Sequence, residues 1–281
     1  MNVRIASIAA AALAGTIAAG AFALAGAPKQ LENKKGDVFY QKPNATQQPI
    51  ALNATVDLPD EDYTITGPAS LAQLTMPDSS QVLMGANTKV QLSSFSQTDV
   101  ANAKFVIYSG KTRFIVKHPQ GAHANYTFQT ATGTVGVRGT EGDIEYGTNG
   151  ALRVNVYELC DKNYPVQVTA GGKTLTVIAG QSLTAQVVNG ILQSSVQQIT
   201  QQIIDQFAPD FGAPTSWDAA TGQIVSYAGN QAAAAANAAT GGVGGGIAGS
   251  AVTQAVGGLF GSKKQAPAST PAPARKSTSC Q

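Results

Sequence analysis

Few residues of this 281-residue chain could bind a metal. His118 and His123 are its two histidines, and they flank a Pro/Gly turn that could bring both imidazoles together as ligands. No cysteine or carboxylate lies near them at the spacing of a zinc site, so we expect solvated loop histidines and no metal. Four clustered carboxylates lack the spacing and the glycine of a Ca²⁺ loop, and we expect a solvated bend there: Asp57, Asp60, Glu61 and Asp62.

Nucleotide-binding and hydrolase motifs are incomplete. Ser109-Gly110-Lys111-Thr112 ends like a phosphate-binding loop, but Phe105 stands where that motif requires its first glycine. The run Gly244–Gly249 matches the Gly-x-Gly-x-x-Gly motif of dinucleotide-binding proteins. It lies in low-complexity sequence without a preceding strand, so we do not interpret it as a dinucleotide site. No Gly-x-Ser-x-Gly nucleophile motif occurs. We therefore predict no catalytic residue, no cofactor and no enzymatic activity.

Composition also argues against an enzyme and against nucleic-acid binding. Charged residues make up 12% of the chain and aromatic residues 6%, whereas about a quarter of residues are charged in typical globular domains. The net charge of +2 provides no basic surface for nucleic acid.

Residues 1–25 have the pattern of an export signal. Arg4 is followed by an uncharged run that ends in the small-x-small cleavage site Ala23-Leu24-Ala25. An uncleaved membrane anchor is the alternative, because about 20 apolar residues suffice to span a bilayer. The run is mostly alanine and glycine, which partition weakly into lipid. We therefore expect a cleaved signal and a periplasmic or secreted mature protein.

Cys160 and Cys280 are the two cysteines. An oxidising compartment would allow them to form a disulfide. Cys280 lies near the end of a Pro/Ser/Thr-rich tail that could reach Cys160, another chain or neither. The pairing therefore stays open.

The elements that would position these residues are predicted to be β strands. We expect an irregular leading segment at 26–62 with one strand near Ile50–Leu58, followed by a β domain at 63–188. Short runs such as Lys104–Tyr108 and Arg113–Lys117 are separated by turn signals such as Ser109-Gly110. Many short strands at this spacing predict an all-β fold, either a twisted solenoid, a barrel or a sandwich-like domain.

The pattern changes after Asn189-Gly190. Apolar residues at steps of three and four predict an amphipathic helix over 189–208, ended by Pro209: Leu192, Val196, Ile199, Ile203 and Phe207. Residues 209–262 read as an Ala/Gly-rich low-complexity segment. Because glycine costs about 1 kcal/mol in a helix, we favour a flexible segment over one that contacts membrane or self-associates. Residues 263–281 are predicted to be a disordered Pro/Ser/Thr tail.

The order of motifs between residues 69 and 187 resembles the FecR domain family of bacterial envelope signalling proteins. An Asp-Gly-Ser-like turn corresponds to Pro77-Asp78-Ser79-Ser80, and a final Ala-Gly-Gln turn corresponds to Ala179-Gly180-Gln181. The most specific part is a Phe-x-Val-x-Thr strand followed by a Val-x-Val-x-Gly-Thr strand. The residues that match it are Phe128, Thr130, Val135, Val137, Arg138, Gly139 and Thr140. We expect Gly139 and Thr140 to shape a bend.

This chain also departs from the family. Family members have Phe two residues after the threonine that corresponds to Thr140, whereas this chain has Gly142. The family also has a Glu-Gly turn after the Val-rich strand, and this chain has Glu158-Leu159-Cys160 there. Sensor members carry a cytoplasmic anti-sigma segment and a membrane helix before this domain, whereas this chain begins with the predicted export signal. We therefore expect the fold to carry over better than the transmembrane signalling role.

The resemblance implies a non-enzymatic binding module that recognises an unidentified envelope protein or ligand, with no nucleic-acid partner. The alternative is a structural protein that is tethered or assembled at the envelope through its Ala/Gly-rich segment. A hydrolase is a third and weaker hypothesis. Oligomeric state and any sigma-factor pathway stay open.

We predict that Gly26 is the mature N-terminus. The small-x-small cleavage site Ala23-Leu24-Ala25 directly precedes it. Intact mass spectrometry of the exported protein checks this, and a mass that includes Met1 would contradict it.

Overall fold

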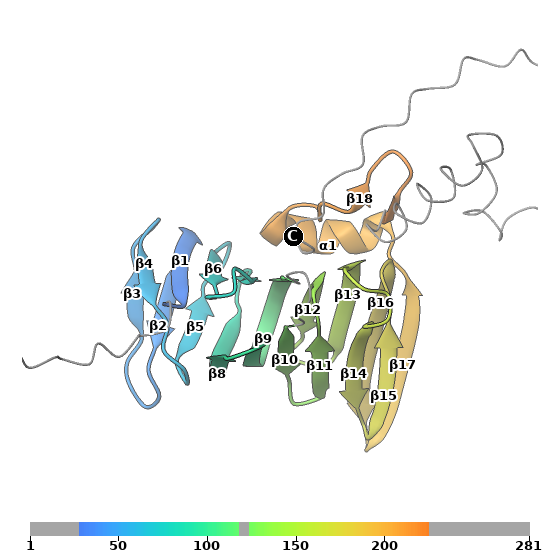
Figure 1. Ribbon diagram of the computed structural model, residues 1–281, viewed down its shortest axis with the longest axis horizontal. Coiled ribbons are helices and arrows are strands. Elements are labelled where there is room, and N and C mark those ends of the chain that lie inside the picture. The colour runs from blue at the N-terminus through green and yellow to red at the C-terminus, as the bar shows by residue number, and fades with distance from the viewer. Residues whose placement is uncertain (1–27, 118–123, 225–281) are drawn as a thin grey trace, which may run out of the picture.

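The computed structural model describes residues 28–117 and 124–224, which form strands and a single helix (Figure 1). The strands in the first half are β1 Gln30–Lys35, β2 Val38–Gln41, β3 Gln48–Ile50, β4 Thr55–Asp57, β5 Tyr63–Thr66, β6 Leu71–Thr75, β7 Gln81–Met84, β8 Lys89–Gln97 and β9 Ala101–Val116. Those that follow are β10 Asn125–Gln129, β11 Gly133–Val137, β12 Thr140–Tyr146, β13 Leu152–Leu159, β14 Val166–Ala170, β15 Lys173–Val177, β16 Gln181–Val188, β17 Ile191–Gln198, β18 Trp217–Asp218 and β19 Gln223–Ile224. The helix is α1 Gln201–Phe211. The prediction of a strand-rich fold with one helix is confirmed.

Strands β1 to β17 form one hydrogen-bonded network that does not close on itself. We divide it into two layers. Layer A has the order β4-β1-β6-β7-β9-β12-β13-β16-β17. Layer B has the order β3-β2-β5-β8-β9-β10-β11-β14-β15. From β10 onward the chain places successive hairpins alternately in layers B and A, and the strands stack along the long axis of the molecule (Figure 1).

Strand β9 belongs to both layers. Its first half pairs with β8 and β10 in layer B, and its second half pairs with β7 and β12 in layer A. We predicted two strands separated by a turn at Ser109-Gly110, and this prediction is wrong. Gly110 instead has φ +97° inside one strand, and a Cβ there would lie 2.5 Å from the Cα of Thr88. Gly110 therefore allows β9 to pass from layer B to layer A, and it does not form a hairpin turn.

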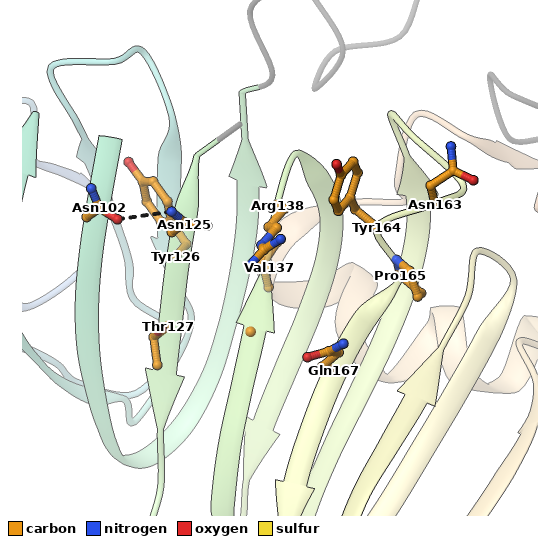
Figure 2. A pocket seen from close by; sticks show the side chains of 11 residues that line it. Asn102, Asn125, Tyr126, Thr127, Val137, Arg138, Asn163, Tyr164, Pro165 and Gln167 are labelled. Atoms are coloured by element: carbon orange, nitrogen blue, oxygen red, sulfur yellow. Dashed lines mark hydrogen bonds between the residues drawn. The ribbon is translucent and has the colours of Figure 1, made fainter. Parts of the chain in front are cut away.

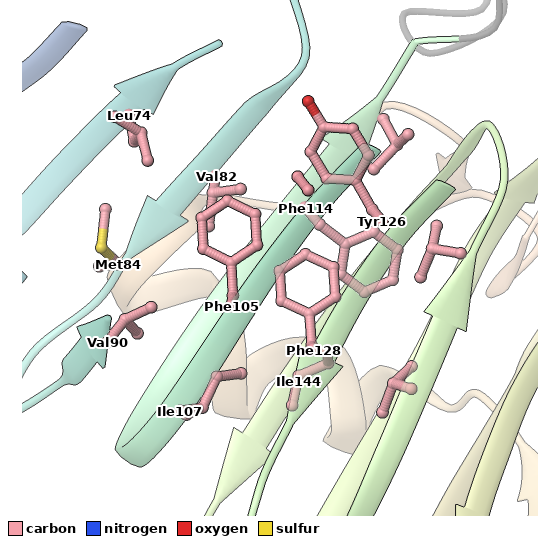
Figure 3. Close-up of a cluster of buried hydrophobic side chains, with 14 of the residues drawn as sticks. Leu74, Val82, Met84, Val90, Phe105, Ile107, Phe114, Tyr126, Phe128 and Ile144 are labelled. Carbon is pink, nitrogen blue, oxygen red and sulfur yellow. The ribbon is translucent and has the colours of Figure 1, made fainter. Parts of the chain in front are cut away.

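The core lies between the layers and is joined across them by aromatic rings (Figure 3). Phe105 and Phe128 come from strands of layer B, and their ring centroids are 5.1 Å apart. Phe114 comes from the layer A half of β9, and its ring lies 5.4 Å from that of Phe128. All three side chains are fully buried. Aromatic burial of this kind contributes both apolar area and ring–ring contact energy.

The leading segment at 26–62 is more regular than we predicted. It contains β1 to β4 instead of one strand, and β1 pairs with β6 across five positions. Its apolar residues Leu31, Val38 and Leu58 are buried in the same core as the later strands. The sequence of β3 and β4 gave no clear alternating pattern, because each strand has three residues and only Ile50 of the six is buried.

The predicted helix over 189–208 is wrong in its first half. Ile191–Gln198 is strand β17, which pairs residue for residue with β16. Asn189 and Gly190 have φ values of 52° and 76°, the conformation of a two-residue hairpin turn. The helix starts at Gln201 and continues through Pro209 to Phe211, so Pro209 does not end it.

The first part of the segment predicted as low complexity, 209–224, is folded. It contains the end of α1 and the β18–β19 pair, and Trp217 is buried beside Tyr157 and the helix residues Ile203 and Ile204. The remaining predictions for the signal at 1–25, His118 and His123, the Ala/Gly-rich sequence from 225 and the tail at 263–281 fall outside the described residues.

We expect Gly142→Ala to destabilise the protein. A Cβ at Gly142 would lie 2.3 Å from the Asn155 carbonyl oxygen and 2.5 Å from the Phe114 ring. Overpacking of this kind costs about 1–3 kcal/mol. The matched control is Gly136→Ala, whose Cβ would meet its nearest neighbour at 3.9 Å. Urea unfolding of both variants checks this, and equal midpoints would contradict it.

Candidate functional site

Most residues of the predicted motif lie inside the protein. Phe128, Val135 and Val137 are buried in the core between the layers. Thr130 closes the β10–β11 turn, because its hydroxyl donates to the Gly133 carbonyl at 3.0 Å and accepts from the Gly133 amide at 3.1 Å. These positions explain why the motif needs these residue types without any ligand.

The bend after β11 has the backbone that we expected. Gly139 has φ +75°, and its carbonyl accepts a hydrogen bond from the Cys160 amide at 3.2 Å. Thr140 starts β12 and is fully buried. Cys160 directly follows β13, but Cys280 lies outside the described residues, so their pairing stays open.

Arg138 differs from the rest of the motif because it is exposed and faces a groove on the outer face of layer B (Figure 2). The groove has a volume of about 430 Å³, within the range of small-ligand sites. Its floor is a row of residues paired across three strands, with Gly136 of β11 between Thr127 of β10 and Gln167 of β14. A Cβ at Gly136 would meet only the Gln167 carbonyl, so the missing side chain leaves the floor open.

The groove walls carry amide and aromatic groups. The Asn125 side-chain amide donates to the Asn102 side-chain oxygen at 3.1 Å, which joins β10 to β9. The Arg138 guanidinium lies over the Tyr164 ring, 5.6 Å from its centroid. Arg138 is the one charged residue among those that line the groove. Figure 2 shows Arg138 and Tyr164 at its upper end, above Thr127 and Gln167. The groove therefore presents hydrogen-bonding groups around one positive charge.

A second polar cluster lies on the outer face of layer A, beneath α1. Arg113 of β9 and Asp143 of β12 are directly opposite each other and form a double hydrogen bond, with distances of 2.7 and 3.0 Å. The Tyr157 hydroxyl also donates to Asp143, at 2.5 Å. All three residues are almost completely buried. Such a pair is tolerated inside a protein because each charge is satisfied by hydrogen bonds.

The same cluster holds the C-terminal end of α1 against the sheet. The Arg113 guanidinium donates to the carbonyls of Phe211 and Gly212, at 3.3 and 3.0 Å. A cation at this end satisfies helix carbonyls that lack intrahelical partners. Lys111 donates to the Gln206 carbonyl at 2.7 Å and forms an ion pair with Asp210 at 3.2 Å. Two basic residues of β9 thus anchor the helix.

Glu141 lies beside this cluster and opposite Glu158 on the neighbouring strand. It is 2% exposed. Burial raises the pKa of Glu141 above its ordinary value, and the nearby carboxylates of Glu158 and Asp143 add to this. Arg113 and the Thr215 hydroxyl, which donates to Glu141 at 3.0 Å, act in the opposite direction without cancelling the rise in pKa.

Sequence reasoning missed both the groove and the cluster under α1. The groove residues Asn102, Asn125 and Gln167 are ordinary polar positions of alternating strands, and nothing in their types suggests a hollow. Arg113 offered a signal, since it directly precedes the apolar run Phe114-Ile115-Val116 in a predicted strand. A charge at such a position indicates a buried partner.

We expect Glu141→Gln to flatten the pH dependence of stability. Because the pKa of Glu141 is raised in the folded protein, its ionised form destabilises that state, and this penalty grows as pH rises from the unfolded pKa to the raised folded pKa and is constant above it. Below the unfolded pKa the penalty is absent. The wild-type midpoint for urea unfolding should therefore fall relative to that of Glu141→Gln as pH rises above the ordinary glutamate pKa. Parallel curves, or the same change in the control Glu145→Gln on the same strand, would contradict this.

Within residues 28–117 and 124–224, no group of three or more His, Cys, Asp and Glu side chains could hold a metal ion. In the same ranges no helix is both long and apolar enough to cross a membrane.

Comparison with known proteins gives one family match. The family model described as FecR protein matches residues 62–158, which include the motif, Arg138 and Arg113. No curated protein matches the chain. Two crystal structures of a putative anti-sigma factor from Parabacteroides distasonis ATCC 8503 are similar, with TM-scores of 0.39 and 0.40 and identities of 17% and 14%. The matches cover 48% and 52% of this chain, and 60% and 73% of those chains. The family match therefore covers about a third of the chain, from residue 62 to residue 158.

Proposed function

We propose that this protein is a non-enzymatic binding module that recognises a protein or ligand during envelope signalling, in the periplasm or outside the cell. The FecR match at 62–158 supports a regulatory role, because this family is regulatory rather than typically catalytic. The two-layered arrangement, which we expected to be solenoid- or sandwich-like, would provide the rigid scaffold for such a site.

The observation that carries the proposal is the exposed Arg138 in a groove within the FecR residues. The other residues of the motif are accounted for by the core or by turns, whereas Arg138 is exposed and contacts the Tyr164 ring at the groove. Its planar guanidinium suits a carboxylate or another group rich in hydrogen-bond acceptors. The neighbouring Asn102, Asn125 and Gln167 would supply further polar contacts.

The partner that this groove suits is therefore an acidic side chain or a terminal carboxylate of an envelope protein, or a small ligand of similar chemistry. The Tyr164 ring holds the Arg138 guanidinium from one side, which reduces the conformational entropy that arginine loses on binding. The open floor at Gly136 gives room for the incoming group.

We expect Arg138→Ala to weaken partner binding without loss of fold. Truncation of an arginine at the centre of a binding site typically costs about 2 kcal/mol or more of binding free energy. A pull-down of envelope extract with the full chain, quantified by mass spectrometry, checks this. A second variant, Gly136→Val, fills the groove floor with a residue suited to a strand and should reduce the same signal.

The matched control is Lys173→Ala, which removes one exposed positive charge from β15 on the same layer. Equal capture by wild type, Arg138→Ala and Gly136→Val would contradict the proposal. Equal capture together with detergent-dependent extraction of all three proteins would favour the structural, tethering alternative.

A further inference from the structure

In the part of the chain that the structure describes, layer A ends at β17, which pairs with β16 alone. Four of strands β1 to β17 pair on one side only among the described residues: β3, β4, β15 and β17. Three of them carry ordinary protection against pairing with another chain. Strand β3 is three residues long and contains Pro49, β4 is three residues long and ends in Asp57, and β15 has five residues and starts at Lys173. Short length, proline and charge all discourage pairing with another strand.

Strand β17 has none of these features. It has eight residues, Ile-Leu-Gln-Ser-Ser-Val-Gln-Gln, with no charge, proline or glycine. A long uncharged edge presents free backbone groups as a template for another strand. Among the four strands with one unpaired side, β17 is therefore the one best suited to pair with another strand.

The hydrogen-bond pattern shows which groups are available. In the β16–β17 hairpin Val188 pairs with Ile191, and just beyond β17 the Ile199 amide donates to the Gly180 carbonyl at 2.8 Å. Bonded residues alternate along an antiparallel strand. The odd-numbered residues of β17 therefore bond to β16, while the backbone groups of Leu192, Ser194 and Val196 point toward the open side.

Apolar side chains gather at the same end. Ile191 is 68% exposed, Val196 47% and Val187 38%, and Ile178 beside β15 is 48% exposed. These are four of the six large apolar residues that are exposed in the described part of the chain. Because side chains alternate along a strand, Val196 and Val187 lie on the face that continues the core, whereas Ile191 lies on the opposite face.

We propose that β17 pairs antiparallel with β17 of a second copy of this chain, around a two-fold axis at Ser194. A register centred on Ser194 places Leu192 opposite Val196 of the second copy, twice, on the face that continues the core. Apolar cross-strand pairs stabilise such a ladder. The absence of charge in β17 means that no like charges meet when the strand faces itself.

A second copy is favoured over a different protein because β17 contains both members of the apolar pair, Leu192 and Val196. A two-fold interface requires a surface that is complementary to itself. In the register around Ser194 the side chain of Leu192 faces that of Val196 from the second copy, so apolar residues meet apolar residues. The backbone N–H and C=O groups of Leu192, Ser194 and Val196 point away from β16 and can bond to the second copy.

Cross-linking tests the register directly. In the proposed pairing the two Ser194 residues face each other as a hydrogen-bonded pair, with Cα atoms about 5.5 Å apart, within the usual reach of a disulfide. Ser194→Cys in the full chain should therefore form a covalent dimer under mild oxidation, with peptides joined through position 194 of both copies. The matched control Ser195→Cys should not, because its two copies are offset along the ladder and lie beyond disulfide reach.

Sedimentation velocity tests the association itself. The full-length wild type should be a dimer, and Ser194→Pro should be a monomer with an unchanged circular dichroism spectrum, since it removes an outward N–H that β16 does not use. If that variant misfolds, Val196→Lys replaces it and should weaken dimerisation about tenfold or more by placing a charge opposite Leu192. A monomeric wild type at every accessible concentration would overturn the proposal. So would a dimer that persists in the variants, or equal cross-linking of Ser194→Cys and Ser195→Cys.

Discussion

The crossing of β9 from layer B to layer A is the constraint on which the rest of this structure depends. The first half of the strand holds β8 and β10, and the second half holds β7 and β12, so both layers are built on one continuous backbone. Phe105 and Phe114 project from the two halves and meet at Phe128. The layers therefore cannot shift past each other without breaking this aromatic contact. Gly110 makes the crossing sterically possible, since the backbone of Thr88 occupies the space of a side chain.

Strand β9 also places a charged residue, Arg113, on the outer face of layer A. Arg113 is buried with Asp143, and removal of one partner from such a pair typically costs about 3–5 kcal/mol because the other charge is left unpaired. Replacement of both by apolar residues often costs nothing. The pair is therefore weak evidence for stability, but its geometry serves docking. Arg113 reaches the carbonyls of Phe211 and Gly212, which an apolar residue could not do.

Local patterns predicted much of the region from residue 63 to 188. Tyr63–Thr66, Gln81–Met84 and Asn125–Gln129 are strands with the bounds that alternation suggests. In β10 the alternation also gives the inward face, since Tyr126 and Phe128 are buried, but in β5 the buried residues are Thr64 and Thr66.

The incorrect predictions concern two segments whose sequences are compatible with two different structures. Leu192 and Val196 fit a helical stripe, but Asn189-Gly190 is also a strong hairpin signal, and pairing with β16 decides the outcome. Ser109-Gly110 has the composition of a turn, yet its glycine is needed for the approach of Thr88.

The candidate site was less predictable than the fold, because it depends on neighbours that the sequence does not specify. Arg138 was singled out from its motif, but Tyr164 and Gln167 reach it only through the β11–β14 pairing. The groove itself results from the absence of a side chain at Gly136. A glycine in a strand is equally compatible with a bulge, a bend or a close backbone approach. That Gly136 forms the floor of the groove is therefore visible only in the structure.

The groove, the helix and the edge of β17 occupy three separate surfaces. The groove lies on the outer face of layer B, α1 covers the outer face of layer A, and β17 ends layer A. Pairing of two β17 strands would continue layer A across a two-fold axis perpendicular to the sheet. The outer faces of both B layers would then point to the same side, so a dimer would present two Arg138 grooves together. A partner with two acidic groups at matching spacing would gain avidity from this arrangement, because its second contact becomes intramolecular. The open edge would in this way convert a weak single groove into a selective bivalent surface.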